Sequence, residues 1–302
     1  MVAGFTVAVL ASRVAVSGAN TLVAHTRLPP FVIGMTLVAL GTDLPEIVNS
    51  IVASLQGLGD VNVGDSIGSV VTQTTLVLGL MPLLGGALLL PRRRSTIVGV
   101  GIIAALLLGA TLMRDGELSR FDGAALVGSW VLLSVVVWRV DGTADTDPPE
   151  PGTGGGHLHA LLQLGVGLAV VTLGVMVAIW GVVQLADAAG VPVFLVSFFG
   201  SSLGTSLPEL LFSVTALRRG HADMAVGDAL GASMIDATLS IGIGPLVAPT
   251  LVSTSLVERG VLVATISVAL AVALLVARGR HTRATGTVLV LVYLAVYVIL
   301  LA

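Results

Sequence analysis

The chain has 302 residues, of which 55% are hydrophobic and only 10% are charged, and its mean hydropathy is +1.05. A soluble domain carries about 25% charged residues, so this composition excludes an ordinary soluble protein and indicates a polytopic membrane protein. The net charge of −3 argues against a nucleic-acid partner, and the absence of cysteine excludes disulfides and thiolate metal sites.

Apolar runs of about 18–25 residues, long enough to cross a bilayer, recur to the end of the chain. Because they recur, we expect the first run to be retained rather than cleaved as a signal peptide. Polar or Gly/Pro-rich segments separate ten predicted spans, at 2–24, 30–56, 64–90, 96–113, 122–140, 159–187, 192–217, 227–250, 257–277 and 284–301. The predicted fold is an all-α membrane protein with about ten transmembrane helices.

A polar segment rich in Pro, Gly and Asp separates the fifth span from the sixth. Its composition cannot bury a core, so residues 141–158 are predicted to form a flexible linker. The linker divides the chain into two predicted five-helix units, residues 1–140 and 159–302.

The two halves resemble each other in sequence at one constant offset, the spacing between Glu46 and Glu209. The segment Gly41-Thr42-Asp43-Leu44-Pro45-Glu46 recurs as Gly204-Thr205-Ser206-Leu207-Pro208-Glu209. The same offset matches Asp60, Gly64, Asp65, Gly68, Thr75, Gly79 and Pro82 with Asp223, Gly227, Asp228, Gly231, Thr238, Gly242 and Pro245. Five spans per copy is an odd number, so the copies are predicted to form two inverted-topology repeats.

Arginines in the short loops predict the orientation, because cytoplasmic loops carry an excess of positive charge. The loops after the odd-numbered spans carry Arg27, Arg92, Arg93, Arg94, Arg139, Arg218, Arg219, Arg278, Arg280 and Arg283. The opposite loops carry only Arg114, Arg120 and Arg259. We therefore expect a multi-pass plasma-membrane protein with both termini outside and the 141–158 linker in the cytoplasm.

Glu46 and Glu209 each lie within a predicted span. A carboxylate near the bilayer centre costs about 2.5–3.5 kcal/mol on insertion scales, so a duplicated one indicates a substrate, ion or proton site. The prolines beside them, Pro45 and Pro208, loosen the helix and free backbone carbonyls. The motif thus offers carboxylate, carbonyl and hydroxyl oxygens, the ligands of Ca²⁺. The alternative is a kinked packing helix whose glutamate meets a partner, and the duplication argues against it.

The glycine segments that begin at Gly64 and Gly227 have two interpretations. Their Gly-x-x-x-Gly spacing is a general device for close helix packing. Polar residues follow at helical spacing, Ser69 and Gln73 in one copy and Ala232 and Asp236 in the other, so each pair shares a helix face. We expect that face to look toward the glutamates.

Together, the two hexapeptides and the two glycine segments resemble the alpha repeats of the sodium/calcium exchanger family of cation/calcium antiporters, in particular its short microbial members. The resemblance implies that Glu46 and Glu209 are the principal Ca²⁺ ligands, aided by the carbonyls of Thr42 and Thr205. It also implies that the neighbours of those threonines and the polar row bind Na⁺. The further candidate ion ligands are Asp43, Ser206, Ser69, Gln73 and Asp236, together with Asp65 and Asp228 of the glycine segments.

The chain departs from the family pattern at several of these positions. Asp43 replaces the usual serine, Gln73 replaces asparagine, Ala232 lacks a hydroxyl, and Asp65 and Asp228 stand where the family has asparagine. Four acids near the midplane repel one another unless cations or protons lie among them. Coupling of Ca²⁺ transport to protons is therefore the alternative to coupling with Na⁺.

The predicted function is exchange of Ca²⁺ for Na⁺ by alternating access, with no enzymatic step and no cofactor. The transported ions and the lipid bilayer are the expected partners, and we expect a monomer. An intramembrane aspartyl protease built on Asp65 and Asp228 would leave the duplicated Pro-Glu motifs unexplained. A passive cation channel is a further alternative, and its conductance would far exceed the turnover of a carrier.

Overall fold

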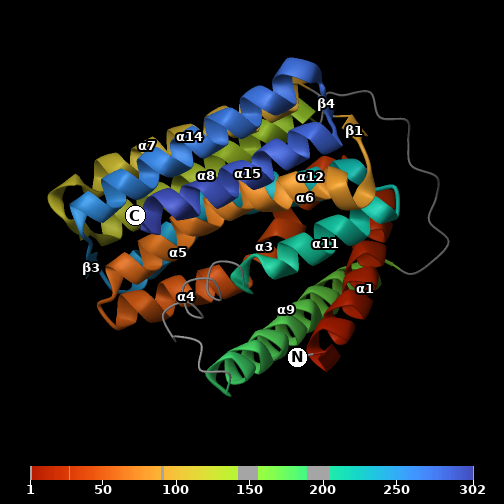
Figure 1. Cartoon of the computed structure of the whole chain (residues 1–302), viewed down its shortest axis with the longest axis horizontal. Helices are drawn as coiled ribbons and strands as arrows, with labels where there is room; N and C mark the ends of the chain where they lie inside the picture. Colours follow the sequence, from red (N-terminus) through yellow and green to blue (C-terminus); the bar gives the residue numbers. More distant parts are fainter. Residues whose placement is uncertain (1, 27, 90–91, 142–155, 189–203, 302) are drawn as a thin grey trace.

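The computed structural model describes residues 2–26, 28–89, 92–141, 156–188 and 204–301 (Figure 1). The first half contains α1 Val2–Thr26, α2 Pro30–Ile33, η1 Gly34–Val38, α3 Ala39–Thr42, α4 Leu44–Leu55, α5 Gly59–Val71, η2 Thr72–Val77, α6 Leu78–Gly85, β1 Leu88–Leu89, α7 Arg92–Leu112, η3 Met113–Asp115, β2 Glu117–Leu118 and α8 Arg120–Asp141. The second half contains α9 His157–Ala188, α11 Leu207–Arg218, α12 Ala222–Ile235, η4 Asp236–Ser240, α13 Ile241–Val247, β3 Thr250–Leu251, α14 Thr254–Arg278, β4 Arg280–His281 and α15 Arg283–Leu301. The segments η1, η2 and η4 are π-helical.

Seven helices of the described part are long and apolar enough to cross a bilayer, and an eighth span results if the bent pair Pro30–Thr42 and Leu44–Leu55 counts as one. The helix Arg283–Val296 is apolar but shorter, and the predicted span 192–217 lies partly outside the described residues. A largely helical, multi-pass membrane protein is thus confirmed. The number of ten spans stays a prediction.

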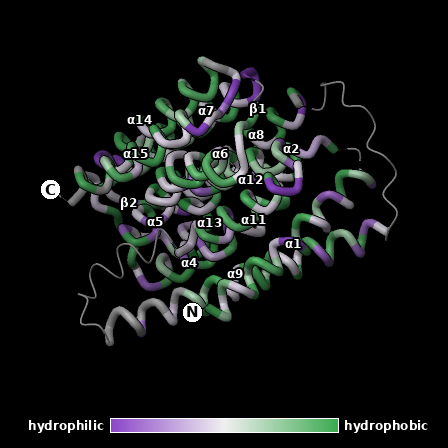
Figure 2. Tube along the Cα trace, turned by 45° about the vertical axis from the view of Figure 1, so that its right-hand side comes forward, coloured by the Kyte–Doolittle hydropathy of each residue, from purple (hydrophilic) through white to green (hydrophobic). Residues whose placement is uncertain are grey.

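Apolar residues run along most helices of the bundle, and the extent of burial separates central helices from peripheral ones (Figure 2). Of the apolar stretch in the span Ala222–Val247, 83% is buried inside the protein, against 17% of that in Arg120–Val140. Helix α12 is therefore central, whereas α8 is peripheral. The exposed apolar side chains of the peripheral helices are the surface that a bilayer would cover.

The sequence repeat is also a repeat of secondary structure. Helices α4 and α11 begin and end at positions that match at the constant offset of the repeat, as do strands β2 and β4. The π-helical segments η2 and η4 also end at matching positions, Val77 and Ser240. Matching stretches of the two halves thus adopt matching local structure.

Each half pairs with segments of the other half. Strand β1 pairs with β4, and β2 with β3, both antiparallel. These two-residue strands were not predicted from the sequence, which indicated helices alone. Backbones also approach closely where Gly79 meets Gly286 and where Gly123 meets Gly242, because a Cβ at any of these positions would lie within 3.0 Å of a backbone atom of the other half. The halves are therefore interlocked and not merely side by side.

Helices α1 and α9 lie side by side along one edge of the molecule (Figures 1 and 2). They touch through small residues: Gly174 approaches Gly4 and Ala8, and Gly167 approaches Ala15. The same pair of helices contacts α11. Close backbone packing at glycine is typical of helix pairs in membranes.

The predicted linker 141–158 lies mostly outside the described residues, which end at Asp141 and resume at residue 156. Asp141 is the last residue of α8, and His157 is the first residue of α9. Both ends of the predicted linker are therefore helical. The division into two five-helix units stays a prediction.

Candidate functional site

The second predicted span is broken at Asp43. Helices α2 to α3 and α4 meet there at 47°, and Asp43 has the non-helical backbone angles φ −80° and ψ 6°. Pro45 explains the break, because it cannot donate to the carbonyl of Gly41. In the second half, Ser206 adopts nearly the same angles, φ −83° and ψ 3°, before Pro208. The predicted loosening of both helices at the prolines agrees with this geometry.

Asp43 and Ser206 are the N-cap residues of α4 and α11, yet neither makes a side-chain capping bond. Asp and Ser at this position ordinarily accept a hydrogen bond from the first-turn backbone, at a gain of about 1 kcal/mol. The side-chain oxygens Asp43 Oδ2 and Ser206 Oγ are buried without a hydrogen-bond partner. These oxygens are therefore available to a bound ion.

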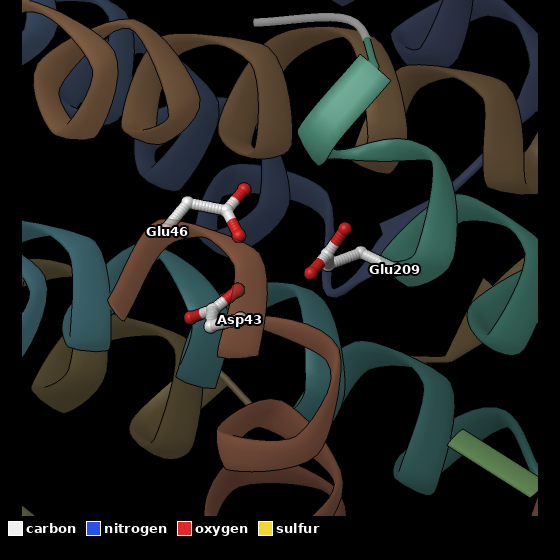
Figure 3. A group of neighbouring side chains, drawn as sticks. All are labelled: Asp43, Glu46 and Glu209. Atoms are coloured by element: carbon white, nitrogen blue, oxygen red, sulfur yellow. The ribbon is translucent and has the colours of Figure 1, made fainter. Parts of the chain in front are cut away.

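Asp43, Glu46 and Glu209 form a buried cluster (Figure 3). Each offers a carboxylate oxygen within 4.8 Å of the others, and their exposed fractions are 0%, 1% and 0%. Both carboxylate oxygens of Glu46 and of Glu209 lack a hydrogen-bond partner. Three ionised carboxylates at this distance and shielded from solvent repel one another, so the arrangement requires cations or protons between them. The glutamates of the two motifs therefore lie together, as two ligands of one ion must.

The polar row behind the glutamates also reaches this cluster. Gln73 Nε2 lies 3.5 Å from Asp43 Oδ1, and Asp236 is close enough to Glu209 to interact with it electrostatically. Both carboxylate oxygens of Asp236 and the hydroxyl of Ser69 are buried without a hydrogen-bond partner. Of the predicted polar face, Gln73 and Asp236 thus lie near the acids.

Gln73 and Asp236 lie in the π-helical segments η2 and η4. A π-helical turn carries an extra residue, and such turns occur frequently at functional sites. Neither segment was predicted from the sequence. The signal available there was the polar run Thr72-Gln73-Thr74-Thr75 inside an apolar span.

Asp228 has a different environment. Its carboxylate accepts hydrogen bonds from Ser213 Oγ at 2.7 Å and from Thr42 Oγ1 at 3.2 Å. Its lone pairs are thus partly occupied by protein donors. Asp228 therefore binds Thr42, the neighbour of Asp43 in the sequence, and its contact with Ser213 was not predicted from the sequence.

Asp65, at the matching position of the first half, accepts a hydrogen bond from Asn49 Nδ2 at 2.7 Å. It interacts electrostatically with Glu46 and Asp236. Asp65 therefore borders the cluster on the side of the first half. The amide of Asn49 is a further contact that was not predicted from the sequence.

The remaining candidates are the two threonines. Thr42 is buried, and its hydroxyl lies 3.2 Å from the carbonyls of Val38 and Ala39 as well as near Asp228. Its side chain is therefore engaged in the protein, so only its carbonyl could serve an ion. Thr205 is half-buried in the corresponding position just before Ser206.

The arrangement suits a hard cation. Ca²⁺ takes about six to eight oxygen ligands. Carboxylates are offered here by four buried acids, Asp43, Glu46, Glu209 and Asp236. The two helix breaks add backbone carbonyls. Irregular backbone at membrane depth is tolerated where protein encloses it. The N-terminal ends of α4 and α11 favour negative charge at Glu46 and Glu209, which lie in their first turns.

Comparison with known proteins places these features in a wider group. Residues 1–139 and 159–302 match the family described as "Sodium/calcium exchanger protein". The chain is 29% identical over 260 residues to the putative antiporter CaxA of Alkalimonas amylolytica, covering 81% of this chain and 78% of the relative. It is 24% identical to the sodium/calcium exchanger MaX1 of Methanosarcina acetivorans, covering 94% and 93%. The solved structure of the sodium-calcium exchanger NCX_Mj has the same fold, with a TM-score of 0.83 at 24% identity, covering 99% of this chain and 96% of that one.

Proposed function

The chain belongs to the sodium/calcium exchanger family and is thus a membrane antiporter of cations and calcium, and we propose that it exchanges Ca²⁺ for Na⁺ by alternating access. One cavity binds either Ca²⁺ or monovalent cations, and the two halves move so that it faces one side of the membrane at a time. No covalent chemistry is involved.

The observation that carries this proposal is the cluster of Asp43, Glu46 and Glu209. Its buried carboxylate oxygens lie within 4.8 Å, and those of the two glutamates have no hydrogen-bond partner. A purely structural role would leave these charges uncompensated, which costs several kcal/mol per ion. A bound cation removes that cost, so we assign the principal Ca²⁺ ligands to Glu46 and Glu209.

The remaining site residues have supporting roles in this proposal. Carbonyl oxygens of Thr42 and Thr205 complete the Ca²⁺ shell, while Asp43, Ser206, Ser69, Gln73 and Asp236 hold Na⁺. Asp65 and Asp228 orient the residues around them. The burial and hydrogen bonding of these side chains support the assignment.

The charges limit what a transport cycle can carry. Asp43, Glu46, Glu209 and Asp236 together bring four negative charges when ionised, and one Ca²⁺ neutralises two of them. The two others need Na⁺ or protons while Ca²⁺ is bound, because an uncompensated buried charge is strongly destabilising. When Ca²⁺ leaves, monovalent cations must replace it until the carboxylate charges are again neutralised. Ca²⁺ transport is thereby coupled to counter-transport of those cations.

The first test is charge removal at constant shape. We expect Glu46→Gln and Glu209→Gln each to abolish ⁴⁵Ca²⁺ uptake into proteoliposomes, because each loses a ligand that no neighbour can replace. Glu258→Gln is the matched control, since Glu258 is exposed on α14 and should leave uptake unchanged. Uptake retained by either site variant would overturn the proposal.

The coupling ion requires a second measurement. With Na⁺ inside the vesicles and none outside, we expect Na⁺ efflux to drive Ca²⁺ uptake, while a pH gradient alone does not. The alternative is coupling to protons, and it is favoured by the two acids without a counterpart in the other copy, Asp43 opposite Ser206 and Asp236 opposite Gln73. Uptake driven by the pH gradient alone would establish that alternative.

We further propose the membrane arrangement that the arginine distribution predicts. Two inverted five-helix repeats, residues 1–140 and 159–302, lie in the plasma membrane as a monomer, with both termini outside and the 141–158 linker in the cytoplasm. Labelling of single cysteines introduced into this cysteine-free chain tests the arrangement directly.

A further inference from the structure

Two prolines lie inside helices directly after the π-helical segments, Pro82 in α6 and Pro245 in α13. A proline has no N–H, so the carbonyl four residues earlier loses its helical donor. These carbonyls belong to Leu78 and Ile241, the first residues of their helices. A buried carbonyl without a partner is costly, so the donors that replace the lost ones matter.

Both carbonyls are satisfied by a side chain from the other half of the chain. His281 Nε2 lies 2.7 Å from the Leu78 carbonyl, and Asn62 Nδ2 lies 3.1 Å from the Ile241 carbonyl. A carbonyl only accepts, so the imidazole and the amide donate. Both side chains are buried, with exposed fractions of 0% and 1%.

The two donors do not occupy matching positions. At the constant offset of the repeat, His281 in β4 corresponds to Leu118 in β2, and Asn62 in α5 corresponds to Ala225 in α12. Leu118 and Ala225 are buried but have no polar side-chain atom. Each half thus contributes one donor, from a different element, to the proline-containing helix of the other half.

The surroundings of His281 favour this donor role. Burial lowers the pKa of His281 below its usual value of 6.5, so the neutral ring prevails at pH 7. Because Nε2 faces a carbonyl, the single proton of the neutral ring belongs there, and Nδ1 is left as an acceptor. Thr285 Oγ1 lies 2.8 Å from Nδ1 and 2.9 Å from the Thr282 carbonyl, so its one hydroxyl proton is shared between these two acceptors.

We propose that His281 and Asn62 are positioning residues of the ion site. Each fixes the end of a π-helical segment by replacing the hydrogen bond that a proline removes. Those segments carry Gln73 and Asp236, so the register of the extra residue decides where these two side chains lie relative to the glutamates. Pro82 and Pro245 each remove one helical hydrogen bond and so allow more than one backbone register, and the two donors stabilise one register.

Threonines inside the same segments make a different kind of contact. Thr75 Oγ1 donates to the Val71 carbonyl, and Thr238 Oγ1 donates to the Met234 carbonyl. These bonds lie within one helix and occur in both copies. His281 and Asn62 differ from the threonines because they tie the ends of the π-helical segments to the opposite half.

The test is a double-substitution cycle. In Pro82→Ala the backbone N–H returns to the Leu78 carbonyl, so His281 becomes dispensable. We expect His281→Leu to raise the apparent KM for Ca²⁺ about tenfold, as roughly 1.4 kcal/mol would, with the maximal rate changed less than about twofold. In the Pro82→Ala background the same substitution should change KM less than about twofold. His281→Gln, which keeps an N–H donor, should restore most of the affinity.

Asn62→Ala and Pro245→Ala form the second cycle. We expect Asn62→Ala to raise the apparent KM for Ca²⁺ about tenfold alone and less than about twofold in the Pro245→Ala background. The crossed combinations, His281→Leu with Pro245→Ala and Asn62→Ala with Pro82→Ala, are the controls and should be additive. Equal KM effects with and without the matching proline would overturn the proposal. So would a cycle that appears in thermal unfolding but leaves KM unchanged, because the bond would then serve stability alone.

The KM readout depends on the proposed function, whereas the thermal cycle does not. If wild-type vesicles show no Ca²⁺ transport, the proposed function fails. If the thermal cycle shows no coupling between His281 and Pro82 or between Asn62 and Pro245, the positioning role fails, whatever the transported ion.

Discussion

Asp43 is the residue at which the two copies of the site motif differ in charge. Ser206, at the matching position, is also an N-cap residue with a buried, unpartnered oxygen. The two side chains thus offer an oxygen from equivalent places, but only Asp43 adds a negative charge. That charge lies within 4.8 Å of Glu46 and Glu209, so it raises the number of cations or protons that the site must hold.

Asp43→Ser tests the importance of this extra charge, because it makes the first copy identical to the second at this position. We expect Ca²⁺ uptake to persist, since both glutamates remain, and to become less dependent on pH, since one proton-binding group is lost. Measuring uptake rates between about pH 6 and pH 8 checks this expectation. A loss as complete as that of Glu46→Gln would instead show Asp43 to be an indispensable Ca²⁺ ligand.

At the residue scale, the sequence predicted the acidic residues of the site better than the side chains that donate hydrogen bonds to them. The inverted repeat was sufficient to predict that Glu46 and Glu209 share a site, because such repeats place matched motifs face to face. Asn49 and Ser213, which bind Asp65 and Asp228, escaped prediction. They are ordinary polar residues without a motif, and only the folded arrangement shows which carboxylate each one meets.

Helices α1 and α9 form an element pair whose contact depends on glycine. A Cβ on Gly167 would lie 2.6 Å from the backbone nitrogen of Ala15, which no side-chain movement can relieve. Two positions on α9 thus have no space for even a methyl group, since Gly174 meets Gly4 and Ala8 in the same way. Packing at backbone distance replaces the hydrophobic effect, which does not act between helices in lipid.

A pair of alanine substitutions in α9 measures this contact. Gly167→Ala should destabilise the protein by about 1–3 kcal/mol, because overpacking forces the helices apart. Gly165→Ala is the matched control, since nothing lies within 4 Å of its added Cβ and alanine favours helix over glycine by about 1 kcal/mol. Thermal unfolding in detergent compares the two. Equal melting temperatures would contradict the close packing of α1 against α9.

The elements themselves were predictable to different degrees. Apolar length was enough to place most spans, and Pro45 was enough to predict a loosened helix, which the structure breaks at Asp43. The π-helical segments and the two-residue strands were not predictable, because both depend on partners far away in sequence. The Leu78 carbonyl, for example, finds its donor 203 residues later at His281.

The whole molecule is held together by contacts between its halves. Both strand pairs, β1–β4 and β2–β3, cross from one half to the other, as do the close glycine contacts of α6 with α15 and of α8 with α13. The ion cluster is divided in the same way, with Asp43 and Glu46 in one half and Glu209 in the other. Neither half contains a complete site.

Separate expression of residues 1–140 and 159–302 tests this interdependence. Produced together, the fragments should assemble and restore Ca²⁺ uptake, because the contacts that join the halves do not require the linker. Produced alone, each should be degraded or aggregate, since its strand edges and buried acids lack their partners. Co-purification of the fragments and ⁴⁵Ca²⁺ uptake provide the readouts. A single fragment that is stable and transports would show that the halves are independent.

The distance along the chain between Leu78 and His281 has a consequence for biosynthesis. The ribosome completes α6 long before it reaches β4, so the newly inserted first half holds an open carbonyl and unbalanced acids until almost the whole chain has been translated. Domains usually fold as they emerge, N-terminal part first. Here β4, which lies between α14 and α15, supplies both the partner strand of β1 and the donor to the Leu78 carbonyl, so the first half cannot complete these contacts during its own synthesis.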